Sequence, residues 1–327
     1  MRPPVPLVSP RQRTPSRPRI ANNMTRKQFT TCLQGIFAPV VTPYTRRGDV
    51  DEGLYRENLD RYRGSGLAGI VVAGSTGEAP YLTGPERLRL TEITRRALKP
   101  PELLIVGTGL ESTRATLDLS REAFQRGADA VLAVTPNYYK ARMDSAALAA
   151  HFRTLADKLR RPVVMYNIPQ FTGVRMSPEL IGALARHPNI VGLKESSGDL
   201  AYMRAILLKV RPGFRVLVGS ALILMDALRA GAAGGVLSQA GFVPELCVGA
   251  YDAVRRRRWK TARDLQERLR ILASKIAIPY GVAGLKLAYE LCGYVGGDPR
   301  LPLIPLPAAA RRVVAATLRE ARAGLEF

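Results

Sequence analysis

The chain contains few cysteines and few histidines. Its three cysteines, Cys32, Cys247 and Cys292, lie far apart and form no Cys-x-x-Cys pair. Because a disulfide framework needs paired cysteines in an oxidising compartment, this usage predicts free thiols in a reducing, cytoplasmic environment. The two histidines, His151 and His187, match no metal-ligand spacing. We therefore expect neither disulfides nor a metal site.

Long apolar runs and acidic residues are also scarce. No uninterrupted apolar run approaches the roughly eighteen residues of a membrane-spanning helix, so we expect no membrane partner. The 27 acidic residues face 49 basic ones, for a net charge of +22, which is compatible with a nucleic-acid partner. However, 40 of the basic residues are arginines, dispersed except at 255–258, as on a solvated surface. We expect no nucleic-acid partner and keep binding through 255–258 as an alternative.

The first thirty residues lack acidic side chains and helix-compatible spacing. Up to residue 19 they contain six prolines and five arginines. Proline breaks helices, and positive charge without a single acidic residue disfavours folding, so we expect residues 1–30 to form a disordered basic tail. The proline content also argues against an amphipathic transit peptide. We infer that Met24 is the natural start of the protein.

From residue 35 onward, short apolar runs alternate with amphipathic stretches. The length of 327 residues and the 46% hydrophobic content allow either two ordinary domains or one α/β barrel. The apolar runs are typical of buried parallel strands, and the amphipathic stretches are typical of helices. We expect strands at 35–42, 69–74, 103–108, 130–135, 162–167, 190–194, 214–219 and 234–238, and helices at 51–63, 85–98, 113–126, 144–160, 178–186, 199–209, 221–230 and 244–257.

Side chains that cap helices mark several of these boundaries. Thr83, Asp144 and Ser177 precede amphipathic stretches, as N-cap residues do. Gly127 and Gly231 follow such stretches, as glycine commonly does at a helix C-terminus. The expected helices therefore have chemically defined ends.

Eight strand–helix units predict an α/β fold, a (β/α)8 TIM barrel over residues 31–257. A doubly wound sheet is the alternative, but it needs a Gly-x-Gly-x-x-Gly turn after its first strand, where this chain has Thr42-Pro43-Tyr44. Residues 258–327 carry three further helical patterns, at 259–275, 281–292 and 308–322. We expect them to form a C-terminal helical region packed on the barrel.

The run 190–197 carries the clearest chemical signal. Apolar residues lead directly into Lys194, and polar residues follow at once. An ammonium group in an apolar interior loses its hydration, which favours the neutral amine. A neutral amine is the nucleophile that condenses with a ketone to form a Schiff base. The simpler alternative is a strand that ends at the surface, where the lysine reaches water.

Polar residues also gather at the other predicted strand ends, where a barrel builds its active site. A Gly-rich turn offers N–H groups to a carboxylate, hydroxyls and a phenol relay protons, and a lysine attacks a keto group. The candidates at strand ends are Ser75, Thr76, Gly77, Tyr138, Tyr166, Lys194 and Ser196.

Three ordered motifs resemble the dihydrodipicolinate synthase/N-acetylneuraminate lyase superfamily (DapA-like). They are Gly-Ser-Thr-Gly-Glu at 74–78, Tyr-Asn-Ile-Pro at 166–169 and Gly-Leu-Lys-Glu-Ser-Ser-Gly-Asp at 192–199. The resemblance covers about residues 34 to 307. It implies a class I, pyruvate-dependent aldolase or lyase, usually a homotetramer, with no metal or organic cofactor.

The resemblance implies roles for individual residues. Lys194 matches the Schiff-base lysine, and Tyr166 matches the tyrosine that shuttles protons to and from the imine and the substrate hydroxyl. Ser75 and Thr76 match the paired hydroxyl residues that bind the pyruvate carboxylate and link Tyr166 to the relay. These four residues would form the centre of the site.

Further residues would complete the site. Tyr138 resembles the tyrosine that enters the site of a neighbouring subunit. Leu237, with the two residues before it, stands where the family places a main-chain carbonyl near the pyruvyl group. We also expect Gly77, Ser196 and Phe171 to contact the substrate.

The branch within the superfamily is indicated by Phe171. Dihydrodipicolinate synthases resemble this chain but place an arginine there, which grips the carboxylate of aspartate semialdehyde, and phenylalanine offers no bidentate clamp. Residues 111–116, 142–148 and 187–192, with Ser196, resemble the 4-hydroxy-2-oxoglutarate aldolase branch. Thr76 and Asn167 depart from that branch, where asparagine and serine are familiar.

We therefore expect a Schiff-base-forming class I aldolase that cleaves 4-hydroxy-2-oxoglutarate into pyruvate and glyoxylate. Lys194 would condense with the 2-oxo group, Tyr166 would take the proton from the C4 hydroxyl, and the C3–C4 bond would break. The alternatives are a 4-hydroxy-tetrahydrodipicolinate synthase, acting on pyruvate and aspartate semialdehyde, and a 2-keto-3-deoxy sugar-acid aldolase or dehydratase. More remote alternatives are a non-catalytic binder on the same barrel and a nucleic-acid-binding protein.

Overall fold

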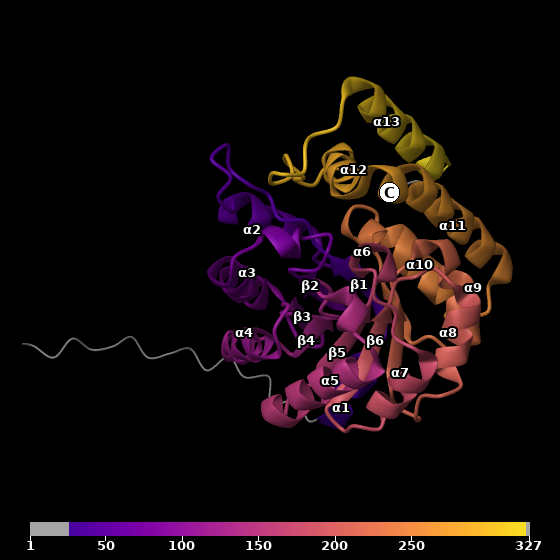
Figure 1. The fold of residues 1–327 in the computed structure, drawn as a ribbon. Helices are drawn as coiled ribbons and strands as arrows, with labels where there is room; N and C mark the ends of the chain where they lie inside the picture. Colours follow the sequence, from indigo (N-terminus) through magenta and orange to yellow (C-terminus); the bar gives the residue numbers. More distant parts are fainter. Residues whose placement is uncertain (1–25, 325–327) are drawn as a thin grey trace, which may run out of the picture.

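Eight parallel strands form a closed barrel in the computed structural model, which describes residues 26–324 (Figure 1). Each strand pairs with its neighbours in chain order, and the eighth pairs with the first. Every observed strand overlaps a predicted one, so the predicted TIM barrel is confirmed. The strands are β1 (Gly35–Pro39), β2 (Gly69–Val72), β3 (Leu103–Gly107), β4 (Ala130–Val134), β5 (Val163–Asn167), β6 (Ile190–Glu195), β7 (Arg215–Val218) and β8 (Gly234–Val236).

Helices separate the strands and cover the outside of the barrel (Figure 1). They are α2 (Glu52–Arg61), α3 (Gly84–Ala97), α4 (Thr113–Gln125), α5 (Ser145–Leu159), α6 (Pro169–Thr172), α7 (Pro178–Ala185), α8 (Leu200–Leu207), α9 (Leu224–Ala230) and α10 (Pro244–Arg255). Short 3₁₀ turns add η1 (Ala79–Tyr81), η2 (Lys140–Arg142), η3 (Ala221–Ile223) and η4 (Ser238–Gly241).

The predicted capping residues begin their helices. Thr83 and Glu86 form a capping box at α3, in which each side chain accepts a hydrogen bond from the backbone N–H of the other. The side chains of Asp144 and Ser177 accept hydrogen bonds from the backbone three residues further on. Gly127 follows α4 with φ +97°, in the left-handed region that favours glycine. Local side-chain chemistry therefore sets these helix boundaries.

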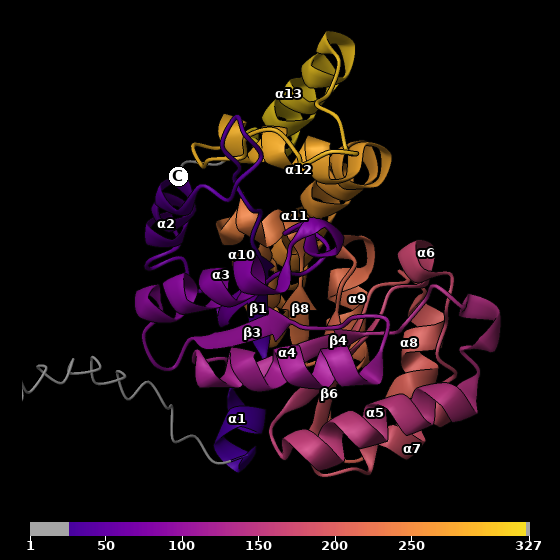
Figure 2. The ribbon, with the colours of Figure 1, turned by 60° about the vertical axis from the view of Figure 1, so that its left-hand side comes forward.

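Apolar side chains form two buried layers. The inner layer fills the barrel with side chains such as Phe37, Val71 and Leu217, and the outer layer lies between strands and helices. Short helix α1 (Arg26–Cys32) closes the amino-terminal end of the barrel, because Phe29 and Leu33 belong to the inner layer. Figure 2 shows α1 at one end of the barrel and the C-terminal helices at the other.

The boundary of the predicted tail needs correction. Residues 26–30, assigned to the disordered tail, lie in α1. The prolines that suggested disorder end at residue 18, and burial of Phe29 stabilises a helix beyond them. The remainder of the proposed tail and Met24 lie outside the described residues.

The C-terminal helices lie over the carboxyl ends of the strands (Figures 1 and 2). They are α11 (Trp259–Leu272), a π-helical turn (Ala273–Ala277), α12 (Ile278–Leu291) and α13 (Ala308–Arg322). The sequence predicted a break after residue 275, whereas the helix continues through the π turn. Pro279 lacks an N–H group and Gly281 has φ +51°, so the run is kinked there rather than ended.

One helical run is long enough to cross a membrane. By length and composition alone, 259–291 is the one such run within residues 26–324, and it contains no uninterrupted apolar stretch of that length because charged residues divide it. Leu272, Ile276 and Tyr289 on this run are fully buried in the outer layer. The run thus also has the packing of a core helix in a folded domain.

His151, on α5, yields a prediction about pH. Burial lowers its pKa from 6.5 to about 4, and its Nδ1 lies 2.8 Å from the Thr113 hydroxyl. Because the unfolded chain binds this proton at higher pH than the folded chain, stability present above pH 6.5 is lost as pH falls toward 4. This group should lower the free energy of unfolding by about 3 kcal/mol over that range. Denaturant titrations should show a shallower pH dependence for His151→Asn, and identical slopes would contradict the assignment.

Candidate active site

Tyr166 on β5 and Lys194 on β6 face each other inside the carboxyl end of the barrel. The two residues are paired in the strand register, and Lys194 Nζ lies 4.2 Å from the centroid of the Tyr166 ring. Each is only 4% exposed, and both line a cavity of about 350 Å³. Among residues 26–324, no carboxylate forms an ion pair with Lys194. The lysine therefore ends a buried strand in a cavity and does not extend into bulk water.

A bulge in β6 turns Lys194 toward the cavity. The pairing of β5 with β6 skips one residue at Val191, so the side-chain alternation changes there. Val191 faces the barrel interior, Leu193 packs in the outer layer, and Lys194 again faces inward. Regular alternation from Val191 would have turned Leu193 inward and Lys194 outward. Gly192 allows the irregularity, because a Cβ there would lie 2.6 Å from the carbonyl oxygen of Arg215.

The turn after β2 brings hydroxyl groups to the same cavity. Ser75 Oγ lies 3.3 Å from the Tyr166 hydroxyl, and Ser75 and Thr76 both line the cavity. Within the described part of the chain, the backbone N–H groups of Ser75 and Thr76 have no hydrogen-bond acceptor. Two adjacent N–H groups of this kind can bind a carboxylate. The turn therefore supplies both an anion site and a hydroxyl in contact with Tyr166.

Gly77 lies in the predicted turn after β2 and supports its backbone. Its N–H donates to the Gly74 carbonyl at 3.0 Å, and its own carbonyl accepts from Thr42 Oγ1 at 2.8 Å. A Cβ at this position would lie 2.9 Å from the Val40 carbonyl oxygen. Gly77 therefore supports the turn and is not among the residues that line the cavity, and its contact with substrate stays a prediction.

The remaining predicted substrate contacts divide into two groups. Ser196 is buried and lines the cavity, and within residues 26–324 its Oγ has no hydrogen-bond partner. Phe171, on α6, is 71% exposed and lies at the rim. Leu237, in contrast, packs in the outer layer, and its neighbour Val236 lines the cavity. The prediction for Leu237 concerns its main-chain carbonyl, which the direction of its side chain does not affect, so it stays a prediction.

Tyr138 lies outside the cavity of its own chain. It follows β4 and is 76% exposed, so its ring is not part of the cavity lining. Its backbone N–H donates to Glu111 Oε2 at 2.8 Å, and that of Asn137 donates to the same oxygen at 2.9 Å. Glu111 thus fixes the loop that presents the tyrosine.

Asn167 and Glu195 support the site from behind. They follow Tyr166 and Lys194 in their strands and therefore face the outer layer. Asn167 Nδ2 donates to Glu195 Oε1 at 3.2 Å, and burial raises the pKa of Glu195. Asn167 thus joins β5 to β6 and does not line the cavity. The serine that is familiar at this position in the 4-hydroxy-2-oxoglutarate aldolase branch would therefore change the support of the two strands and not a contact with substrate.

The C-terminal helices supply a roof that sequence reasoning did not find. Six residues of the π turn and α12 line the cavity, and four further polar residues also line it. An apolar helical pattern predicts a helix buried in the core. Only Pro279 and Gly281, which interrupt the pattern, indicated that this helix differs from an ordinary core helix. The roof residues are Ala273, Ala277, Ile278, Gly281, Val282 and Leu285, and the additional polar ones are Gln170, Ser220, Ser238 and Gln239.

A second cavity of about 360 Å³ adjoins the first across Ser75 and Tyr166. Arg87 lines it, and its buried guanidinium donates to the backbone carbonyls of Ala79 and Gly107. Ser75 and Tyr166 are therefore reached from both cavities.

Comparison with known proteins places this geometry in a family. Residues 32–321 match the family model described as the dihydrodipicolinate synthetase family. A probable mitochondrial 4-hydroxy-2-oxoglutarate aldolase from Emericella nidulans is 36% identical over 294 residues, which cover 88% of this chain and 94% of the relative. A 4-hydroxy-tetrahydrodipicolinate synthase from Methanothrix thermoacetophila is 34% identical over 275 residues, which cover 84% and 92%.

Solved structures agree with the sequence relatives. A prophage protein of the dihydrodipicolinic acid synthase family from E. coli K12, in complex with pyruvate, superposes with a TM-score of 0.84 at 28% identity, covering 89% of this chain and 99% of that one. A dihydrodipicolinate synthase from Acinetobacter baumannii, also complexed with pyruvate, gives a TM-score of 0.84 at 28% identity, covering 88% and 99%. The resemblance predicted from three motifs is confirmed. The chain belongs to the dihydrodipicolinate synthetase family of pyruvate-dependent aldolases and lyases.

Proposed function

We propose that this enzyme cleaves 4-hydroxy-2-oxoglutarate into pyruvate and glyoxylate through a Schiff base on Lys194. The observation that carries the proposal is the buried lysine, which has no ion-pair partner among the described residues and faces Tyr166 across a cavity. The substrate is supported by the relative from Emericella nidulans and by Phe171, which stands where an arginine clamp would bind aspartate semialdehyde.

The first step forms the imine. The Lys194 amine attacks the C2 carbonyl of the substrate, and loss of water leaves a protonated imine between Nζ and C2. The N–H groups of Ser75 and Thr76 hold the adjacent C1 carboxylate, which fixes the keto carbon beside the amine.

The second step breaks the carbon–carbon bond. Tyr166 takes the proton from the C4 hydroxyl, with Ser75 Oγ at 3.3 Å as the next group in the relay. The C3–C4 electron pair moves to the imine, which releases glyoxylate and leaves an enamine. Protonation of C3 and hydrolysis of the imine then release pyruvate and the free Lys194 amine.

The part of the cavity that would hold the aldehyde has polar side chains but, within residues 26–324, no acidic side chain and no arginine. Among the described residues that line the cavity, Lys194 is the one Lys, Arg, Asp or Glu. The buried hydroxyl of Ser196, which has no partner among the described residues, is a donor available to a second carboxylate, whereas Gln170 Nε2 already donates to the Ser196 carbonyl at 2.7 Å. Aspartate semialdehyde is the alternative acceptor, because the relative from Methanothrix thermoacetophila is named a 4-hydroxy-tetrahydrodipicolinate synthase. A 2-keto-3-deoxy sugar acid is the other alternative.

We also propose a homotetramer in which Tyr138 enters the site of a neighbouring subunit. The tyrosine is 76% exposed on its own chain, and Glu111 fixes its backbone. Solvent exposure of a large aromatic ring is explained when a partner covers it. Sedimentation velocity should give the mass of four chains, and Tyr138→Ala should lower activity without unfolding the monomer. A fully active monomer would contradict the proposal.

Borohydride trapping tests the nucleophile. With pyruvate, the wild-type enzyme should acquire a pyruvyl adduct that peptide mass mapping places on Lys194, and Lys194→Ala should acquire none. Tyr166→Phe should retain the adduct but turn over roughly two to four orders of magnitude more slowly, because proton transfer loses its acid–base group. Lys275→Ala, which removes an exposed lysine of the π turn, is the matched control and should trap normally. An adduct on any other lysine would refute the assignment.

Substitution of Phe171 tests which aldehyde the enzyme accepts. The wild-type enzyme should prefer glyoxylate to aspartate semialdehyde in the condensation direction. Phe171→Arg should raise kcat/KM for aspartate semialdehyde by about tenfold or more, because it adds a cation to a cavity rim that has none. Phe171→Leu controls for loss of the ring alone. Wild-type preference for aspartate semialdehyde would favour the alternative function.

A further inference from the structure

A buried ion pair joins the active-site turn to the C-terminal helices. Lys286 Nζ, on α12, lies 2.7 Å from Oε1 of Glu78, and neither side chain is more than 1% exposed. Lys286 Nζ also donates to the backbone carbonyl of Asp298 at 2.7 Å. Glu78 belongs to the turn that follows β2, whereas Lys286 belongs to the roof of the cavity.

Glu78 ends the turn that carries the proposed carboxylate site. Its backbone is left-handed, with φ 60° and ψ 37°, a conformation that is unfavourable for a residue with a side chain. Its N–H donates to the Ser75 carbonyl at 3.1 Å, which closes the turn around Ser75 and Thr76. The fixed carboxylate of Glu78 thus holds the turn in a conformation that its backbone disfavours.

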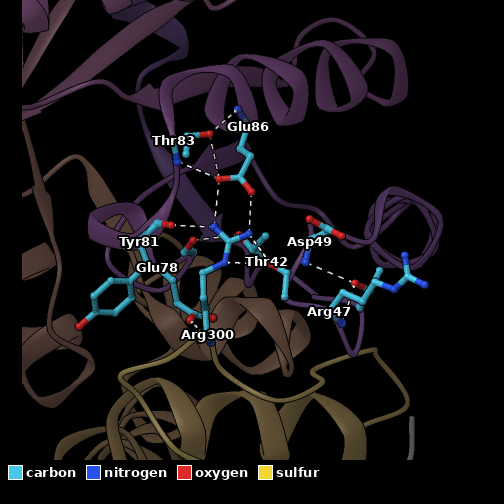
Figure 3. A network of polar contacts seen from close by, with 11 residues as sticks. Thr42, Arg47, Asp49, Glu78, Tyr81, Thr83, Glu86 and Arg300 are labelled. Carbon is cyan, nitrogen blue, oxygen red and sulfur yellow. Dashed lines mark hydrogen bonds and ion pairs between the residues drawn. The ribbon is translucent and has the colours of Figure 1, made fainter.

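Arg300 provides a second attachment (Figure 3). Its backbone N–H donates to Oε2 of Glu78 at 2.8 Å, so both oxygens of that carboxylate are held by the C-terminal region. Its guanidinium pairs with Glu86 at 2.6 Å, lies 4.3 Å from the centroid of the Tyr44 ring, and donates to the Gly48 carbonyl. The C-terminal region is therefore fastened to the loop after β1, the turn after β2 and the first turn of α3.

The helix that bears Lys286 also shapes the cavity. Val282 and Leu285 line it from above, and Ser75 and Thr76 line it from the barrel. The Glu78–Lys286 contact thus fixes the roof and the turn relative to each other. A buried ion pair adds little net stability compared with apolar residues of the same size, yet it requires one geometry. Control of geometry therefore explains the Glu78–Lys286 pair better than a gain in stability does.

We propose that Glu78 and Lys286 are positioning residues for pyruvate, which hold the N–H groups of Ser75 and Thr76 at the place where the carboxylate must lie for Lys194 to attack. The inference rests on the Schiff base proposed above. Loss of the pair should weaken capture of pyruvate, because the turn is then free to leave its left-handed conformation.

The test uses borohydride trapping over a range of pyruvate concentrations in the full-length enzyme. Glu78→Gln and Lys286→Met should each raise the half-saturating pyruvate concentration about tenfold or more, while saturating pyruvate still labels Lys194. The double variant should show no further rise, because both changes remove the same contact. Trapping needs no aldehyde, so the result does not depend on the identity of the acceptor.

Asp129→Asn is the matched control. It breaks another buried ion pair, Arg95 Nη1–Asp129 Oδ2 at 2.9 Å, at the opposite end of the barrel. It should lower the Tm without changing the pyruvate dependence. If Glu78→Gln and Lys286→Met behave in the same way, the positioning role is overturned while the Schiff base stands.

Two further outcomes are no trapping by the wild-type enzyme and failure of the buried variants to fold. If wild-type enzyme traps no pyruvate, the proposed function fails and this inference fails with it. If the buried variants do not fold, Glu78→Asp replaces them, because it keeps the charge but shortens the side chain whose Oε1 lies 2.7 Å from Lys286 Nζ. It should raise the half-saturating concentration severalfold, and an unchanged value would overturn the inference.

Discussion

The functional site depends on the pairing of β5 with β6. A one-residue change of register turns every following side chain to the other face of a strand. The bulge at Val191 makes that change once, so that Leu193 enters the outer layer and Lys194 enters the cavity beside Tyr166. Gly192 makes the bulge sterically possible. The proposed nucleophile thus owes its direction to the pairing of the two strands.

The C-terminal helices complete a site that the barrel alone leaves open. A TIM barrel presents its active site at the carboxyl ends of the strands, and loops usually cover it. Here α12 and the π turn form an apolar roof, and buried contacts from Lys286 and Arg300 hold that roof to the turn after β2. The C-terminal region is therefore part of the active site as well as of the fold.

Ionisable side chains are distributed differently in the cavity and in the structure behind it. Lys194 is the one Lys, Arg, Asp or Glu among the described residues that line the cavity, whereas the buried pair of Glu78 and Lys286 lies behind the turn. An uncharged polar lining leaves the lysine free to react and limits carboxylate binding to N–H groups and hydroxyls. The support behind the site uses ion pairs because these fix one geometry.

The sequence by itself determined the strands, the helix boundaries at Thr83 and Ser177, and the chemistry of the motifs, because periodicity and capping are local. It did not reveal that the Gly77 backbone supports the turn or that the Leu237 side chain packs in the outer layer, since neighbours in sequence do not show what a residue contacts. Lys194 and Lys286 both interrupt apolar stretches and present the same signal in sequence. Only the tertiary structure decided between them, because it brings Glu78 to Lys286 and brings no such partner to Lys194 within residues 26–324. Partners that are distant in the chain are set by packing, which local pattern does not contain.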